Sequence, residues 1–165
     1  MAKERLSGAT YVTRGYGQVE PNHLSAQRTG QIYAQLPLAA TLTKVENGQF
    51  VKYDYANNEV NTTSANGEFM LVYNEVKLYD VREQYEDFVL EGGVPRVFKT
   101  NVGDIFTTNT IKADPGSLAT GDKLTVGTDG YLTENSGEAE GMIWQVAKVY
   151  TLADGQPAVK IVRIQ

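Results

Sequence analysis

The chain has 165 residues with no cysteine, one histidine and a formal net charge of -5, from 20 acidic and 15 basic residues. This length suits a single domain with or without an arm, because domains cluster at about 100–150 residues. The acidic balance argues against a nucleic-acid binder and against a polybasic membrane-surface protein, since both need a basic excess. The missing cysteines exclude disulfides, thiolate zinc sites and thiol catalysis.

The apolar content favours a folded protein without a membrane partner. Hydrophobic residues make up 41% of the sequence and aromatic residues 10%, which is enough for a sizeable core. No apolar run approaches the roughly 18–20 residues of a membrane-spanning helix, and the N-terminus has no apolar signal segment. We therefore expect a soluble protein that is made in a cytoplasm.

The first 35 residues differ from the rest, because apolar aliphatic side chains are sparse and no 3.6-residue or 2-residue period persists. This composition predicts an extended N-terminal arm over 1–35 and a single β-rich domain over 36–165. Arginine and tyrosine combine contact area with directional hydrogen bonds and are enriched at interface hot spots. The alternative is a solvated tail. The candidate partner-binding residues are Tyr11, Arg14, Tyr16, Arg28 and Tyr33.

Strand patterns begin at Leu36, with runs over 36–42, 49–55 and 68–73. The dipeptides Asn47-Gly48 and Asn66-Gly67 precede the second and third runs. Asn-Gly supplies the positive φ angles of a tight hairpin turn, so each pair predicts such a turn.

One short helix is predicted over 81–90. Asp80 and Glu83 resemble a capping box, and Gly92-Gly93 supplies the glycine that commonly follows a helix. The residues between them that share one helical face are Val81, Tyr85, Phe88 and Val89.

Short strands return after this helix, and the last two flank a turn over 153–157, which predicts a hairpin. Gly103-Asp104 and Gly121-Asp122 each open a strand, where the aspartate can bond backbone amides just beyond the corner. Regular short strands predict a mainly β fold, a small β-barrel or β-sandwich with one short helix. The predicted strands are 94–99, 104–108, 123–126, 131–133, 142–152 and 158–164.

Catalytic and metal-binding motifs are not expected. His23 is the only histidine, which excludes two-histidine metal sites, and no G-x-S-x-G motif accompanies it for a serine triad. Acidic residues near 83–91 are interpreted as a solvated helix face rather than a glycosidase pair. Those near 54–59 and 122–129 lack the order of an EF-hand loop and fit turns better. Trp144 is expected in the core rather than as a sugar platform. We predict no catalytic residue, metal or cofactor.

The C-terminal half resembles the small capsid decoration (cement) proteins of tailed bacteriophages. The residues that carry the resemblance are the two strand–turn units over 103–108 and 121–133 and the closing hairpin over 146–164. The resemblance spans roughly residues 95–165. It implies a non-enzymatic virion protein that binds the outer surface of a capsid, bridges major capsid protein subunits and forms homo-oligomers, commonly trimers.

Three other functions remain open at this point. One is a tail-tube or head-fibre-base subunit, which would assemble by itself into rings or tubes. Another is a carbohydrate-binding or adhesion module, for which Trp144 and the ten tyrosines are the motive. The last is a carboxylate-based hydrolase, which the scarcity of catalytic residue types disfavours.

Overall fold

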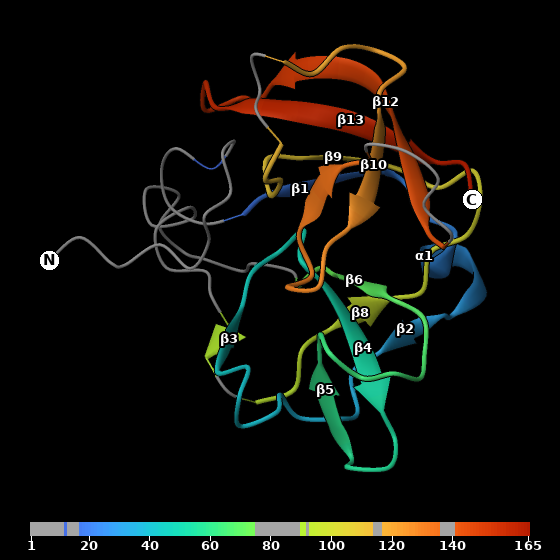
Figure 1. Cartoon of the computed structure of the whole chain (residues 1–165), viewed down its shortest axis with the longest axis vertical. Helices are drawn as coiled ribbons and strands as arrows, with labels where there is room; N and C mark the ends of the chain where they lie inside the picture. Colours follow the sequence, from blue (N-terminus) through green and yellow to red (C-terminus); the bar gives the residue numbers. More distant parts are fainter. Residues whose placement is uncertain (1–11, 13–16, 75–89, 92, 114–116, 136–140) are drawn as a thin grey trace, which may run out of the picture.

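The computed structural model describes residues 12, 17–74, 90–91, 93–113, 117–135 and 141–165. The described chain is mainly β, with two antiparallel sheets in a small sandwich-like arrangement and one short helix. This confirms the predicted fold class. In Figure 1 the larger sheet occupies the upper part of the molecule and the smaller sheet the lower part.

The larger sheet has six strands in the order β1-β9-β13-β12-β10-β11, so it includes the first and the last of the described strands. Its centre is the hairpin of β12 and β13, which pair from Trp144↔Arg163 to Thr151↔Pro157. The strands are β1 (Val19–His23), β9 (Ile105–Thr108), β10 (Lys123–Val126), β11 (Leu132–Glu134), β12 (Ile143–Thr151) and β13 (Pro157–Arg163).

The smaller sheet has five strands in the order β2-β8-β6-β4-β5. A separate two-stranded pair joins β3 (Lys44–Val45) to β7 (Leu90–Glu91), and helix α1 (Ala26–Thr29) follows β1. The strands of this sheet are β2 (Ile32–Tyr33), β4 (Phe50–Asp54), β5 (Glu59–Asn61), β6 (Met70–Val72) and β8 (Val97–Phe98).

An aromatic cluster joins the two sheets in one core. The ring of Trp144 lies 5.0 Å from that of Phe106 in the larger sheet and 5.8 Å from that of Phe50 in the smaller sheet. All three side chains have 0% exposure. Trp144 is therefore a core residue, as predicted, and it is not available as a sugar platform.

The smaller sheet also buries its other face. Because side chains alternate along a strand, β4 directs Phe50 to the shared core, and Val51 and Tyr53 to a second cluster. Three leucines pack against that second cluster: Leu36, Leu38 and Leu42.

The strand predicted over 36–42 is thus largely wrong. Only Leu38 forms an isolated bridge, to Val60. This apolar segment covers the sheet from outside instead of pairing within it, so its hydrophobicity reflects burial rather than a strand.

The two Asn-Gly turns form, but not as hairpins. Gly48 and Gly67 have positive φ angles of 93° and 96°. However, β3 pairs with β7, and β6 pairs with β4 and β8, so neither turn joins two strands that pair with each other. The other predicted strands agree with β4, β6 and β8–β13 to within a few residues.

The predicted arm over 1–35 contains two described strands. Strand β1 pairs with β9 (Val19↔Thr108), and β2 pairs with β8 (Ile32↔Phe98). The boundary at residue 35 is therefore not where the sheets begin. Strand β1 lies at a sheet edge, half exposed and with a register shift that spans Pro21, which explains the weak apolar pattern.

The helix predicted over 81–90 falls outside the described residues except for Leu90, which begins β7. The short helix in the described part of the chain is α1, which ends at Gly30 with a left-handed φ of 71°.

The two Gly-Asp corners adopt one turn geometry. The amide of Asp104 donates to the carbonyl of Asn101 (3.0 Å), while the Asp104 carboxylate accepts the Asn101 amide (2.9 Å). Asp122 and Ala119 repeat both bonds, at 3.2 and 2.7 Å. The aspartates thus bond amides three residues before them, not beyond the corner as expected.

Candidate functional site

The structure describes two of the five predicted partner-binding residues. Arg28 lies exposed in the last turn of α1, and Tyr33 lies half-buried in β2. Tyr11, Arg14 and Tyr16 fall outside the described residues. Arg28 does not line the pocket to which Tyr33 contributes, so the structure does not bring these two together.

A buried carboxylate holds the start of the described N-terminal segment. Glu46 is 1% exposed and accepts two bonds, from the Gly17 amide (2.7 Å) and the Tyr131 hydroxyl (2.8 Å). A Cβ at Gly17 would collide with the Thr110 hydroxyl and with the carbonyl oxygen of Asn47, so glycine is required there. Glu46 and Tyr131 therefore fix the point at which this segment joins the body.

Gln18 continues the attachment. Its amide donates to Asn109 Oδ1 (2.6 Å), and its carbonyl accepts the Thr108 hydroxyl (2.7 Å). Its side chain donates to Asp154 (2.9 Å), in the turn between β12 and β13. Contacts from three separate segments thus fix residues 17 and 18, which we call the N-terminal anchor.

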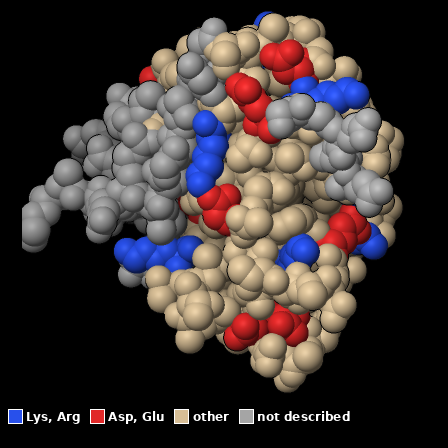
Figure 2. All heavy atoms as spheres, viewed as in Figure 1, with Lys and Arg blue, Asp and Glu red and all other residues tan. Residues whose placement is uncertain are grey.

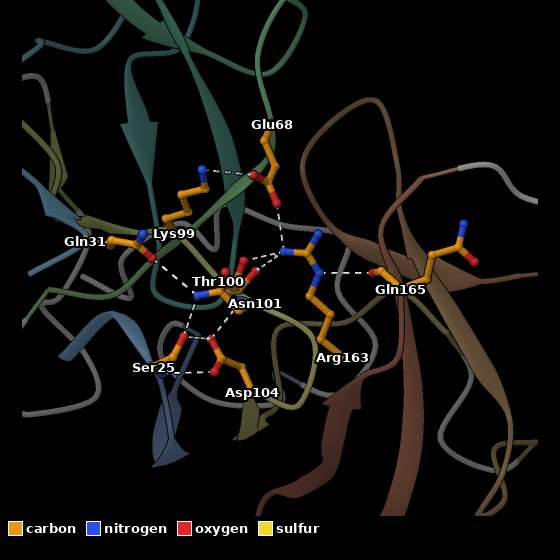
Figure 3. Close-up of polar contacts among 9 residues, drawn as sticks. All are labelled: Ser25, Gln31, Glu68, Lys99, Thr100, Asn101, Asp104, Arg163 and Gln165. Atoms are coloured by element: carbon orange, nitrogen blue, oxygen red, sulfur yellow. Dashed lines mark hydrogen bonds and ion pairs between the residues drawn. The ribbon is translucent and has the colours of Figure 1, made fainter. Parts of the chain in front are cut away.

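A polar junction ties α1 to the start of β9 (Figure 3). Asp104, 1% exposed, accepts both the amide and the hydroxyl of Ser25, each at 2.9 Å. The side-chain amide of Asn101 donates to the Ser25 hydroxyl (2.7 Å) and to Gln31 (3.3 Å). The helix is therefore held to the larger sheet through one carboxylate.

A pocket of about 300 Å³ opens beside the second cluster and carries three tyrosines. The ring of Tyr53 lies 5.7 Å from the rings of Tyr33 and Tyr55, at interplanar angles of 70° and 77°. Tyr53 is 4% exposed, whereas Tyr55 is 67% exposed. The other lining residues are Asp54, Ala56, Ser64, Asn66, Gly67, Glu68, Met70 and Lys99. We call this the tyrosine pocket.

Ion pairs position the polar side of the tyrosine pocket. The Glu68 carboxylate lies 3.7 Å from Lys99 Nζ and 2.7 Å from Arg163 Nη1. Arg163 also donates to the carbonyl and hydroxyl of Thr100 (Figure 3). Since Arg163 belongs to β13, the larger sheet fixes a carboxylate that lines a pocket of the smaller sheet.

Asp54 is a second acidic residue among those that line this pocket. The side chain of Asn57 donates to it at 3.0 Å, and the amides of Asn57 and Ala56 donate at 3.2 and 3.0 Å. These bonds, with the Asn57 side chain as the largest cause, lower the pKa of Asp54 below its ordinary value. The carboxylate therefore remains charged in mildly acidic solution.

Tyr53 and Tyr55 are functional candidates that the sequence analysis did not single out. The usable signal was their spacing, because residues two apart in a strand lie on the same face. The alternation of Tyr53, Asp54 and Tyr55 resembled an ordinary half-buried strand, and it held no information about the distant loop over 64–68 that completes the pocket.

The described residues do not form a metal site, a membrane-spanning helix or, on the face drawn in Figure 2, a basic surface stripe of the kind that binds nucleic acid. His23 is exposed in β1. No group of three or more His, Asp or Glu in the described ranges could hold a metal ion, and no described helix has the length and apolarity to span a membrane. Figure 2 shows basic and acidic side chains interspersed on one face, without a basic stripe there.

Comparisons with protein families, with curated proteins and with solved structures find no match.

Proposed function

We propose that this chain is a non-enzymatic structural protein of a virion, which binds the outer surface of a phage capsid and stabilises contacts between major capsid protein subunits. The resemblance of residues 95–165 to capsid decoration proteins and the mainly β fold support this proposal. The single observation that carries it is the N-terminal anchor.

The anchor matters because a clamp must transmit force from its binding segment to a rigid body. Gly17 and Gln18 are bonded to Glu46, Asn109 and Asp154, which belong to three different segments. Residue 17, from which the chain continues toward Tyr16, Arg14 and Tyr11, is therefore a fixed point of the fold. A partner bound by those residues would be coupled to the segments that hold Gly17 and Gln18.

The energetic benefit would come from repetition. Packaged DNA presses outward on a capsid, and a protein that bridges neighbouring subunits raises the free energy of separating them. Each contact can be weak, because linked copies act at high effective concentration. A homo-oligomer such as a trimer, placed on the capsid surface, would use this effect without contacting nucleic acid or membrane.

A matched pair of double variants tests the role of the N-terminal residues. We expect Arg14→Ala with Tyr16→Ala to weaken binding to capsids by about tenfold or more, since hot-spot residues each contribute about 2 kcal/mol. Lys148→Ala with Tyr150→Ala removes a similar pair from β12, where the Lys148 ammonium lies 5.6 Å from the Tyr150 ring. The measurement is co-sedimentation with capsids that lack the protein, over a range of concentrations.

We expect the Lys148 and Tyr150 variant to bind as the unaltered protein does. Equal binding by both double variants would refute the proposed role of Arg14 and Tyr16.

A further inference from the structure

We infer that the tyrosine pocket binds an uncharged sugar ring of a glycan. This inference goes beyond the proposed function, because it concerns a second ligand at a different surface. The tyrosine pocket combines an aromatic surface, a rim with both hydrogen-bond donors and acceptors, and nearly balanced charges.

The aromatic surface is ordered before any ligand binds. Tyr53 is almost completely buried, and its hydroxyl accepts the Gln35 amide at 3.2 Å. Tyr33 and Tyr55 each meet this fixed ring in an edge-to-face arrangement. Tyrosine offers a large contact area at low cost in side-chain entropy, and a pyranose ring presents a C–H face that stacks on such rings.

The rim of the pocket offers both donors and acceptors. A sugar hydroxyl is a donor and an acceptor at once, so its recognition uses carboxylates together with amides or ammonium groups. The Asp54 carboxylate accepts bonds from Ala56 and Asn57, which fix its position before a ligand binds. Glu68 and Lys99 stand at the same pocket with their positions set by the ion pairs.

The charged residues of the pocket distinguish between anionic, cationic and uncharged ligands. Asp54 and Glu68 contribute two carboxylates to the lining residues, and Lys99 and Arg163 both pair with Glu68, so the opposite charges nearly balance. An anionic ligand such as an acidic sugar or a phosphate would still meet the two carboxylates. The Lys99 ammonium in turn opposes a quaternary ammonium, which would otherwise suit an aromatic cage. An uncharged ligand avoids both repulsions. The volume of about 300 Å³ lies at the lower end for ligand pockets, which suits one or two rings.

The test is a titration of the free, full-length protein, without capsids, followed by amide NMR shifts. The probes are neutral methyl glycosides of glucose, galactose, mannose and N-acetylglucosamine, with choline and sialic acid as charged comparisons. We expect at least one neutral glycoside to shift the amides of residues 53–56 and 64–68, and neither charged probe to bind more tightly.

Tyr55→Ala should lower the affinity for that glycoside tenfold or more, while Tyr55→Phe keeps most of it. Tyr150→Ala removes a tyrosine outside the pocket and should have no effect. The inference is overturned if no neutral glycoside shifts these amides, if a charged probe binds more tightly, or if Tyr55→Ala binds as the unaltered protein does.

The two proposals fail independently. Tyr55→Ala should leave capsid binding unchanged, and the Arg14→Ala, Tyr16→Ala variant should bind the glycoside normally. Sugar binding without capsid binding would refute only the proposed function, and the reverse result would refute only this inference.

Discussion

Asp104 and Asp122 form a matched pair whose replacement by alanine should have unequal effects on stability. Both carboxylates accept the amide three residues earlier in the same turn. Only Asp104 is almost fully buried, and only Asp104 accepts two further bonds, from the amide and the hydroxyl of Ser25. The comparison therefore isolates what the added junction contributes.

The expected losses follow from these contacts. Asp104→Ala removes three bonds to a charged acceptor, each worth about 1.5–3 kcal/mol, although water can replace the acceptor for the exposed Asn101. We expect Asp104→Ala to cost about 3–5 kcal/mol, and Asp122→Ala about 1 kcal/mol because one bond at a more exposed position is lost.

Urea unfolding measures both losses, and an unchanged slope against denaturant would show that only stability has altered. Ser25→Ala gives an independent check. It removes the hydroxyl that donates to Asp104 and accepts the Asn101 side chain, but it leaves the amide bonds to Asp104, so it should cost less than Asp104→Ala. Equal losses for Asp104→Ala and Asp122→Ala would refute the conclusion that the junction between α1 and β9 stabilises the fold.

Three further predictions concern the core, a tight turn and an acidic side chain. Trp144→Ala should cost about 3–5 kcal/mol in urea unfolding, because a fully buried ring is removed; a loss below 1 kcal/mol would contradict its place in the core. Gly130→Ala should abolish folding or lower the melting temperature severely, since its Cβ would meet the Phe50 carbonyl, whereas Gly155→Ala has open space and suffers only backbone strain. The carboxyl of Asp54 should titrate by NMR below its ordinary value of 3.8. Its contribution to stability is present above the unfolded pKa and is lost as the pH falls through the folded pKa, so Asp54→Asn should flatten the acid limb of stability against pH.

Local sequence patterns predicted those strands that pair with a neighbour in a sheet and bury one face. The hairpin of β12 and β13 was predicted from its alternation and its turn, although the register shift between Val146 and Lys148 was not. The run over 36–42 was misassigned, because a loop that covers a sheet is as apolar as a strand within it. Strand β1 was missed, because an edge strand needs little apolar sequence.

The candidate site was less accessible to prediction, because it depends on contacts between distant segments. Tyr33 was selected for its residue type, but its neighbours Tyr53 and Tyr55 lie about twenty positions away and were not linked to it. The N-terminal anchor depends on Glu46 and Tyr131, which no spacing rule connects with Gly17. Only the pairing of the strands brings these residues together.

The most direct test of the proposed function is the molar mass of the purified protein by light scattering, alone and with expanded capsids that lack it. We expect a small, discrete species in solution that saturates the capsids at a fixed number of copies per shell. Absence of capsid binding, together with self-assembly into rings or tubes, would contradict the proposed function and favour a tail-tube subunit.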